Sequence, residues 1–318
     1  MPEKSYRRAL QMTLCALIML LFAGAEDMQP IVPSSSEVML ARLGESIIYA
    51  GEHQLSPGQS VHFSKEELLA GNLLYVSVHA PVPADAPVQQ ARNVRKMVGL
   101  YVPAAQDVSL AEEAIYALCD LCAENPLIKT WITDGMRAPS QQHALQDATF
   151  EAYRSTMTTQ DALRAARQDV PDSGKSEHQL ATSFDVKFTG ALDWSRTDPL
   201  ERSPDGIWLQ ENAWRFGFIR RYPPDKAQIT GVFNEEMHFR YVGREHALVM
   251  QATGWCLEEY LAALKEFGQL AIEQGEKISY ILSCPMTDAG AAFHVPDGYS
   301  CTASADNRGY AIGVFIPD

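Results

Sequence analysis

The sequence predicts an α+β fold, in which helices and strands mix without a regular strand–helix–strand repeat. Helical spacing of apolar residues appears between residues 110 and 121 and again between 245 and 267. Strand-like alternation appears at 184–188 and through the tail from 276 to 318. Because these two patterns are interspersed rather than alternating, the sequence favours the α+β class over a parallel α/β sheet.

The first 25 residues have the charge order of a secretory signal peptide. Lys4, Arg7 and Arg8 precede an apolar run over 9–23, and the run ends in Ala23-Gly24-Ala25. The run is shorter than the roughly 18 to 20 apolar residues that comfortably span a bilayer. We therefore expect cleavage ahead of retention as a membrane anchor, and in either case a protein that acts outside the cytoplasmic membrane.

The net charge is −14, from 26 basic and 40 acidic side chains. Nucleic-acid-binding proteins present basic stripes, and no basic cluster follows the first eight residues. We therefore expect no nucleic-acid partner, and contact with a membrane only through an uncleaved N-terminal segment. The protein is expected to be a monomer.

The remaining elements follow in order along the chain. Residues 26–64 contain Ser- and Pro-rich stretches and are expected to be a linker with at most one hairpin. Two S-x-x-E boxes, at Ser64 and Ser109, predict helix starts. Strands are expected at 73–78, 127–133 and 184–188, helices at 139–168, 208–216 and 245–267, and a small β extension at 268–318.

Five cysteines follow the N-terminal segment. Cys119 and Cys122 lie in a helical stretch without a second C-x-x-C, so buried thiols are favoured over a redox or metal role. In an exported protein Cys284 and Cys301 could form a disulfide, and the odd count leaves at least one free thiol.

Metal-binding residue types concentrate in two short segments. His178 and Asp185 stand seven residues apart, with Asp185 on the polar face of the expected strand 184–188. The second segment carries Glu235 and, three residues later, His238. A catalytic zinc takes three His or carboxylate ligands and keeps one position open for water. The three ligands would be His178, Asp185 and His238, with Glu235 as general base.

Each of these pairs also has an ordinary structural interpretation. A His-x6-Asp or a Glu-x-x-His spacing is common by chance, both on protein surfaces and among buried residues whose polar atoms are hydrogen-bonded. Spacing alone leaves a metal hydrolase and a structural arrangement as even alternatives.

The linked motifs resemble those of the VanY-like D-alanyl-D-alanine carboxypeptidases. The chain reads Ser-Glu-His-Gln at 176–179, Phe-Gly-Phe-Ile at 216–219 and His-Phe-Arg-Tyr-Val-Gly at 238–243. Upstream, Gly-Met-Arg at 135–137 is similar to the family's substrate-binding turn. The resemblance covers about residues 65 to 265.

The resemblance implies a compact zinc-peptidase domain of the Hedgehog/DD-peptidase type at 65–267, with a small antiparallel sheet flanked by helices. It implies one zinc ion on His178, Asp185 and His238, and Glu235 as the base. Arg137 would bind the terminal carboxylate of the substrate or the developing oxyanion.

Two further residues are implied by the resemblance to contact the peptide end, Gln142 and Ser176. The chain departs from the usual motif at four places: Ala138 replaces a Ser, Ala181 a Gly, Ser183 an Ala, and Glu236-Met237 a Pro-Trp pair. None of these changes removes an expected ligand, but Glu236 becomes a rival for the role of base.

The function implied is hydrolysis of the terminal D-alanine from peptidoglycan stem peptides, as a D,D- or an L,D-carboxypeptidase. A peptidoglycan endopeptidase on the same fold and a non-catalytic cell-wall-binding module remain alternatives. A carboxylate-binding Arg137 favours an exopeptidase, and Glu235 favours an enzyme, because a binding module does not need the base.

Overall fold

The computed structural model describes residues 38–51, 53–126, 130–233, 235 and 237–318. The signal peptide or anchor expected at 1–25 lies outside these residues. In the described part of the chain, no helix combines the length and the apolar character needed to cross a membrane.

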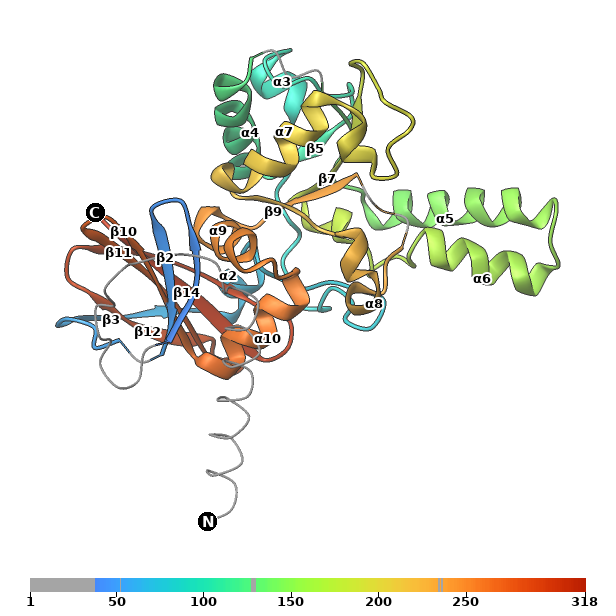
Figure 1. The fold of residues 1–318 in the computed structure, drawn as a ribbon. Coiled ribbons are helices and arrows are strands. Elements are labelled where there is room, and N and C mark those ends of the chain that lie inside the picture. The colour runs from blue at the N-terminus through green and yellow to red at the C-terminus, as the bar shows by residue number, and fades with distance from the viewer. Residues whose placement is uncertain (1–37, 52, 127–129, 234, 236) are drawn as a thin grey trace. The chain divides into compact units, whose positions relative to one another are not determined.

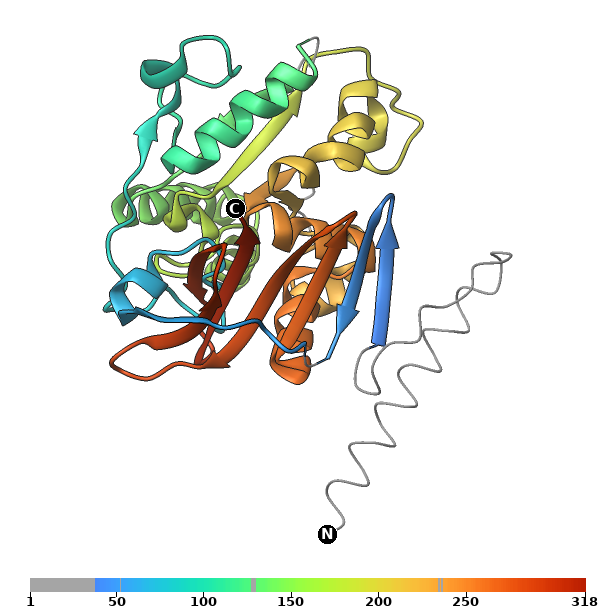
Figure 2. The same cartoon turned by 90° about the vertical axis from the view of Figure 1, so that its left-hand side faces the viewer.

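A six-stranded antiparallel sheet joins the beginning and the end of the described chain (Figure 2). Its strand order is β1-β2-β10-β11-β14-β13. The strands are β1 (Val38–Leu43), β2 (Ser46–Ala50), β10 (Gln269–Gln274), β11 (Lys277–Pro285), β14 (Tyr310–Pro317) and β13 (Tyr299–Ala305).

The two faces of this sheet are covered differently. Helices α9 (Arg244–Thr253) and α10 (Leu257–Phe267) pack on one face, as Figure 1 shows. The other face packs against a two-stranded sheet made of β3 (Gly58–Phe63) and β12 (Ala291–Pro296). Strands β1–β3 and β10–β14 are called the β module below.

The linker with at most one hairpin, expected at 26–64, is described only from residue 38 on, where β1 and β2 form a hairpin and β3 a further strand, all within the β module. Strand β2 pairs with β10 along its whole length, with Ile48 opposite Ile272. Alternate side chains of β2, such as Ile48 and Ala50, are buried against α9 and α10. The small β extension expected at 268–318 is likewise part of a larger sheet, because β10 pairs with β2 on one side and with β11 on the other.

Whether Cys284 and Cys301 pair was left open by the sequence, and in the described residues both are free thiols. Cys284 lies on β11 opposite Ala311, and Cys301 lies on β13 opposite Phe315. Strand β14 separates the two, and two strand spacings amount to about 9.5 Å, beyond the reach of a disulfide.

A second, four-stranded antiparallel sheet has the order β6-β7-β9-β8. Its strands are β6 (Thr130–Asp134), β7 (Ser183–Phe188), β9 (His238–Tyr241) and β8 (Phe218–Arg220). The predicted alternation in β7 is confirmed, since Phe184, Val186 and Phe188 are buried in one apolar cluster while Asp185 stays partly exposed.

The apolar cluster under this sheet is closed by α4 (Glu112–Glu124). The buried stripe predicted for that helix is confirmed at Ala114, Ile115, Leu118 and Leu121. The helix start is different, because Ser109 pairs in the short strand β5 and Ala111 takes the N-cap position. The box at Ser64 is confirmed, with reciprocal Ser64–Glu67 hydrogen bonds at the start of α2 (Lys65–Leu69).

The strand expected at 73–78 is not formed. Leu73, Leu74 and Val76 are buried, but the segment is irregular apart from one isolated bridge between Ser77 and Ala80. Its backbone hydrogen bonds go partly to side chains, as in Leu73 N–H to Ser304 Oγ at 2.9 Å. Burial, rather than strand pairing, explains its apolar pattern.

The remaining elements complete the surroundings of the four-stranded sheet. They are β4 (Arg92–Asn93), α3 (Val94–Val98), β5 (Ser109–Leu110), α5 (Pro139–Arg154), α6 (Thr159–Asp169), α7 (Pro204–Asn212), α8 (Ala227–Thr230) and the 3₁₀ turns η1 (Glu177–Leu180), η2 (Pro199–Arg202), η3 (Ala213–Phe216) and η4 (Pro224–Lys226). The helical region expected at 139–168 is a pair of helices, α5 and α6, packed side by side (Figure 1).

Ala181 connects η1 to β7 in a left-handed conformation, with φ 60° and ψ 5°. This is the position where the resembling family usually has glycine, and a Cβ there costs about 1–2 kcal/mol. The residue is fully buried, and its carbonyl accepts a hydrogen bond from Ala111 N–H at 2.7 Å. The strained turn therefore keeps a fixed geometry between two short elements.

Replacing Ala181 by valine is expected to lower the free energy of unfolding by about 2–3 kcal/mol, because a β-branched side chain strongly disfavours positive φ. Chemical denaturation followed by circular dichroism measures this loss. Ala181→Gly is the control, expected to change the free energy by less than about 1 kcal/mol, since relief of strain and loss of a buried methyl oppose each other. Equal stability of the valine and glycine variants would contradict the left-handed geometry.

Candidate metal centre

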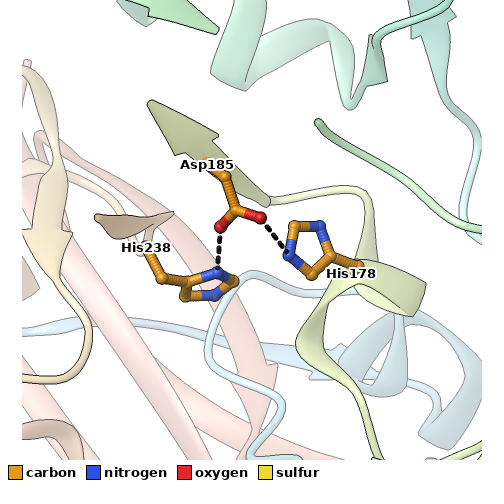
Figure 3. Close-up of side chains that lie close together, drawn as sticks. All are labelled: His178, Asp185 and His238. Carbon is orange, nitrogen blue, oxygen red and sulfur yellow. Dashed lines mark hydrogen bonds and ion pairs between the residues drawn. The ribbon is translucent and has the colours of Figure 1, made fainter. Parts of the chain in front are cut away.

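His178, Asp185 and His238 lie together although they come from three separate elements (Figure 3). His178 belongs to η1, Asp185 to β7 and His238 to β9. Asp185 and His238 are direct cross-strand partners, which brings their side chains onto the same face of the sheet. One nitrogen or oxygen atom from each of the three residues lies within 4.8 Å of the others.

The His178 ring is oriented by a backbone carbonyl. Its Nδ1 lies 2.6 Å from the oxygen of Gly135. A carbonyl oxygen only accepts hydrogen bonds, so Nδ1 carries the proton. The other nitrogen, Nε2, faces Asp185 Oδ2 at 3.4 Å. In the neutral ring that nitrogen has a lone pair available for a metal ion.

In the His238 ring the two nitrogens are used the other way round, with Nδ1 facing Asp185 and Nε2 facing Glu177. Its Nδ1 lies 2.9 Å from Asp185 Oδ1, and its Nε2 lies 3.5 Å from Glu177 Oε2. The two imidazoles meet edge to face, with ring centroids 4.8 Å apart. The Nδ1 of His238 therefore turns toward the point that Asp185 and the Nε2 of His178 also face.

The electrostatics of this cluster suit a cation. Burial opposes a positive charge on His238, but the carboxylates of Asp185 and Glu177 outweigh burial and raise the pKa of His238 to about 10. Burial likewise acts to raise the pKa of Asp185, and the two imidazoles outweigh it and hold that pKa well below its usual range. A divalent metal ion can take the place of the proton that the cluster otherwise holds.

The donor set fits zinc. Two imidazole nitrogens and one carboxylate oxygen are a ligand combination that Zn²⁺ uses in catalytic sites, where a fourth position stays open. His178 and His238 are almost completely buried, whereas the Asp185 side chain is 34% exposed. The position between the three residues is thus reached from the side of Asp185.

Glu177 stands behind the cluster as a buried carboxylate. Its Oε1 accepts hydrogen bonds from Arg221 Nε at 2.8 Å and from Arg240 Nη1 at 2.7 Å. Its Oε2 faces His238 Nε2 and accepts a bond from the Ser183 hydroxyl at 3.4 Å. Burial acts to raise the pKa of Glu177, but Arg221 and Arg240 outweigh it and keep the carboxylate ionised.

The same charge network reaches α10. Arg221 forms a bidentate ion pair with Glu258, with nitrogen–oxygen distances of 3.0 and 2.7 Å. Both side chains are buried. The sequence assigned no role to Glu177, although it lies in the quoted motif at 176–179, and none to Arg221. Spacing alone does not distinguish a buried carboxylate from a surface one.

Glu235 lies beside the candidate ligands without being one of them. Its Oε2 is 3.9 Å from His238 Nδ1, and its side chain is 34% exposed. A carboxylate at that distance from a ligand nitrogen is near enough to exchange a proton with a small molecule held by the metal. The rival Glu236 lies outside the described residues.

Arg137 approaches the cluster from the turn after β6. Its Nε donates to Asp134 Oδ2 at 2.8 Å, and its Nη1 donates to Gln142 Oε1 at 2.7 Å. The remaining nitrogen, Nη2, lies 3.8 Å from Asp185 Oδ2. Two of its nitrogens are fixed by neighbours, and the third faces the candidate metal position.

Gln142 differs from the direct substrate contact that was expected of it. Its side chain is fully buried, and its Nε2 donates to the carbonyl of Pro171 at 2.8 Å. Both ends of the amide are therefore engaged, and the residue orients Arg137. Ser176 is also buried, directly before η1, and its contact with a peptide stays a prediction.

Tyr222 is a further neighbour that the sequence did not single out. Its ring packs against the His238 ring with centroids 5.2 Å apart and an angle of 31° between the planes. The replacement of the usual tryptophan by Met237 leaves a side chain that packs partly buried against the core of the four-stranded sheet.

Comparison with known proteins bears on this site directly. The VanY family model, described as D-alanyl-D-alanine carboxypeptidase, matches residues 108–244. That match includes Arg137, the three candidate ligands and Glu235.

Two relatives are similar to the chain over longer stretches than the family model. A D-alanyl-D-alanine carboxypeptidase of Enterococcus faecalis is 35% identical over 195 residues, covering 60% of this chain and 65% of the relative. The chain therefore spans slightly less than two thirds of that relative. A D-alanyl-D-alanine carboxypeptidase of Enterococcus faecium is 27% identical over 309 residues, covering 95% of each chain.

The fold is shared with a solved D,D-dipeptidase. The structure of vancomycin resistance D,D-dipeptidase VanXYg, in complex with a D-Ala-D-Ala phosphinate analogue, superposes with a TM-score of 0.66. It is 23% identical, and the match covers 81% of this chain and 98% of that one. The expected Hedgehog/DD-peptidase fold is thereby confirmed. Residues 108–244 thus match the VanY family model, and the chain is similar to D-alanyl-D-alanine carboxypeptidases of enterococci.

Proposed function

We propose that this protein is a zinc-dependent carboxypeptidase that removes the terminal D-alanine from peptidoglycan stem peptides. The observation that carries the proposal is the convergence of His178, Asp185 and His238 beside Glu235 and Arg137. The first three supply a zinc-binding donor set, Glu235 a proton acceptor, and Arg137 a permanent positive charge.

Zinc held by these ligands supplies Lewis acidity that polarises the scissile carbonyl and makes water acidic enough to lose a proton near neutral pH. Glu235 accepts that proton on its carboxylate and passes it to the departing amino group. Its partial exposure lets it meet both water and substrate. The carbonyl of Gly135 accepts a hydrogen bond from the His178 ring, and the carboxylate of Glu177 lies 3.5 Å from Nε2 of the buried His238 ring.

Arg137 selects for an exopeptidase substrate. Its guanidinium is a planar donor that matches a carboxylate, and Asp134 and Gln142 hold it in one orientation. A peptide whose last residue places its free carboxylate on Arg137 brings the preceding peptide bond toward Asp185 and the metal. An internal peptide bond offers no carboxylate at that point.

Action on cell-wall peptides places the protein outside the cytoplasmic membrane. The basic and apolar order of residues 1–25 supports export, either as a cleaved signal peptide or as a retained anchor. Mass spectrometry of the N-terminus of the protein purified from its native cells distinguishes the two.

The direct test is product analysis with zinc-loaded protein. Peptides ending in D-Ala-D-Ala, peptides ending in L-Lys-D-Ala and cross-linked muropeptide dimers are compared by mass spectrometry. Release of free D-alanine from either linear peptide supports the carboxypeptidase. Cleavage of dimers alone would reassign the protein as an endopeptidase, and binding without cleavage of any of them would reassign it as a binding module.

Glu235→Gln is expected to lower kcat about 10²–10⁴-fold while leaving stoichiometric zinc, because the base is lost and the ligands are intact. Release of D-alanine under saturating substrate measures kcat, and atomic absorption measures zinc. Glu245→Gln, on the first turn of α9, is the matched control with unchanged kcat. A Glu235 variant with wild-type kcat would remove this residue from the mechanism.

His178→Ala is expected to lose zinc and activity together, because only two ligands remain. His143 is exposed on α5, so His143→Ala is a control that keeps both. Zinc content is measured after dialysis against buffer without chelator. Retention of one zinc per chain in the His178 variant would show that the ligand set is wrong.

Glu177→Gln is expected to weaken zinc affinity about 10–100-fold, because the partner that orients His238 becomes neutral. Competition with a chromophoric chelator gives the dissociation constant. Glu258→Gln is the matched control: it removes a charge from the same buried network without contacting His238. Both variants lose stability, but only the first is expected to change zinc affinity; an equal change in both would mean that network stability, and not ring orientation, governs binding.

A further inference from the structure

A cavity of about 450 Å³ lies beside β8, the edge strand of the four-stranded sheet. Arg220 on β8 lies opposite Phe239 on β9, and His238 precedes Phe239, so the His238 side chain points to the other face of the sheet. None of the described residues of the candidate metal centre lines the cavity. The cavity is therefore separate from that centre, and its size lies within the roughly 300–1,000 Å³ that is typical of small-molecule sites.

Two tryptophans supply apolar surface to the cavity. Trp214 on η3 and Trp255, which lies between α9 and α10, are partly exposed. Each also packs against the apolar cluster between these helices and the six-stranded sheet. The Trp214 indole is held by a hydrogen bond from its Nε1 to the carbonyl of Glu211 at 2.8 Å. Because the face of an aromatic ring is negative, it attracts weakly positive C–H groups such as those of a sugar ring.

Arg220 places hydrogen-bond donors in the wall of the cavity. Its Nη1 and Nη2 donate to the carboxylate of Asp198 at 2.7 and 3.1 Å, and Nη1 also donates to Gln210 Oε1 at 3.3 Å. The Arg220 side chain is only 10% exposed, and its Nε has no hydrogen-bond partner among the described residues. A buried N–H without a partner is costly, so an acceptor atom of a ligand that reaches it would be favoured.

The two cations of the cavity wall are neutralised by partners within the protein. Arg220 forms its ion pair with Asp198, and Lys226 pairs with Glu259 at 2.9 Å. Asp225 adds a further, exposed carboxylate to the wall. A bound anion would be repelled by Asp198 and Asp225, because like charges at short range disfavour each other. A neutral ligand that carries hydroxyl and amide groups meets no such repulsion.

We propose that this cavity binds a neutral sugar ring of the N-acetylated amino-sugar class, as found in the glycan strand of peptidoglycan. The choice of this sugar rests on the proposed function. Ring hydroxyl groups would accept hydrogen bonds from Arg220, and the amides of Gln210 and Gln251, which line the cavity, would supply further donors and acceptors. The C–H face of the ring would contact the tryptophans.

The cavity and the metal centre share one short segment of chain. Residues 223–226 line the cavity and directly follow Tyr222, whose ring packs on that of His238 with centroids 5.2 Å apart. A protein that holds a glycan strand near its metal centre raises the local concentration of the peptides attached to that strand. The sugar site would thereby keep the protein on the cell wall between successive cleavages.

Calorimetric titration of the zinc-loaded protein with a trimer of N-acetylglucosamine tests the inference, because this ligand carries no peptide for the metal centre. Binding is expected with a dissociation constant on the order of 0.1–1 mM. A trimer of galacturonic acid, in which each ring carries a carboxylate, is expected to bind at least about 10-fold more weakly, because Asp198 and Asp225 repel it. Equal or tighter binding of the acidic trimer would contradict a site for neutral sugars.

Two variants locate the site. Trp255→Leu keeps an apolar side chain on the cluster but removes the ring, and Arg220→Lys keeps a cation beside Asp198 but removes the Nε–H group. Each is expected to raise the dissociation constant of the neutral trimer about 10-fold or more. Circular dichroism verifies that both variants are folded.

Trp194→Leu is the matched control, because Trp194 is exposed and does not line the cavity, and it is expected to keep the wild-type dissociation constant. Absence of binding to the wild-type protein up to about 20 mM trimer would overturn the inference. Wild-type affinity in both Trp255→Leu and Arg220→Lys would also overturn it, since the sugar would then bind elsewhere. Release of D-alanine is measured separately: if the trimer binds as expected and no muropeptide is cleaved, the sugar site stands and the proposed carboxypeptidase fails.

Discussion

The buried carboxylate of Glu177 is the interaction on which this structure depends. It lies between two buried arginines and a buried histidine, where an unpaired charge would cost several kcal/mol. The partners come from two neighbouring strands: Arg221 directly follows β8, and Arg240 and His238 lie on β9. Removing Glu177 would take from Arg240 its carboxylate partner, whereas Arg221 would keep its ion pair with Glu258.

This network also explains how a rigid centre is combined with accessible chemistry. The two histidines are buried, whereas Asp185, Glu235 and Arg137 retain some exposure. Groups that only hold a cation can be immobile. Groups that exchange protons or bind a peptide end need contact with solvent, and they lie on the open side. The ion pair between Arg221 and Glu258, which lies on α10, connects this buried network with the helices that cover the six-stranded sheet.

The sequence carried more information on the site than on the domain organisation. Alternation in 184–188 was enough to place Asp185 opposite the core, because a strand has only two faces. In the described part of the expected linker, the hairpin of β1 and β2 belongs to a larger sheet, which the sequence did not indicate because the partner strand of β2 lies far along the chain and such pairing leaves no local pattern. The Ser109 box failed for a tertiary reason, since Ser109 is used in a strand pair with Asn93. Glu177 lies in a quoted motif, but the sequence did not indicate its role, because that role depends on two arginines more than forty positions away.

The pairing of β2 with β10 has a consequence for how the protein forms. Ala50 lies opposite Leu270, so two paired strands of the six-stranded sheet are separated in sequence by the segment that contains the whole four-stranded sheet and its metal centre. Strand β14 then inserts between β11 and β13, in the interior of that sheet. Contacts so distant in sequence carry a large loop-closure cost, and proteins built on them fold slowly. The six-stranded sheet can therefore be completed only once β10 to β14 are available, whereas all four strands of the second sheet lie between residues 130 and 241.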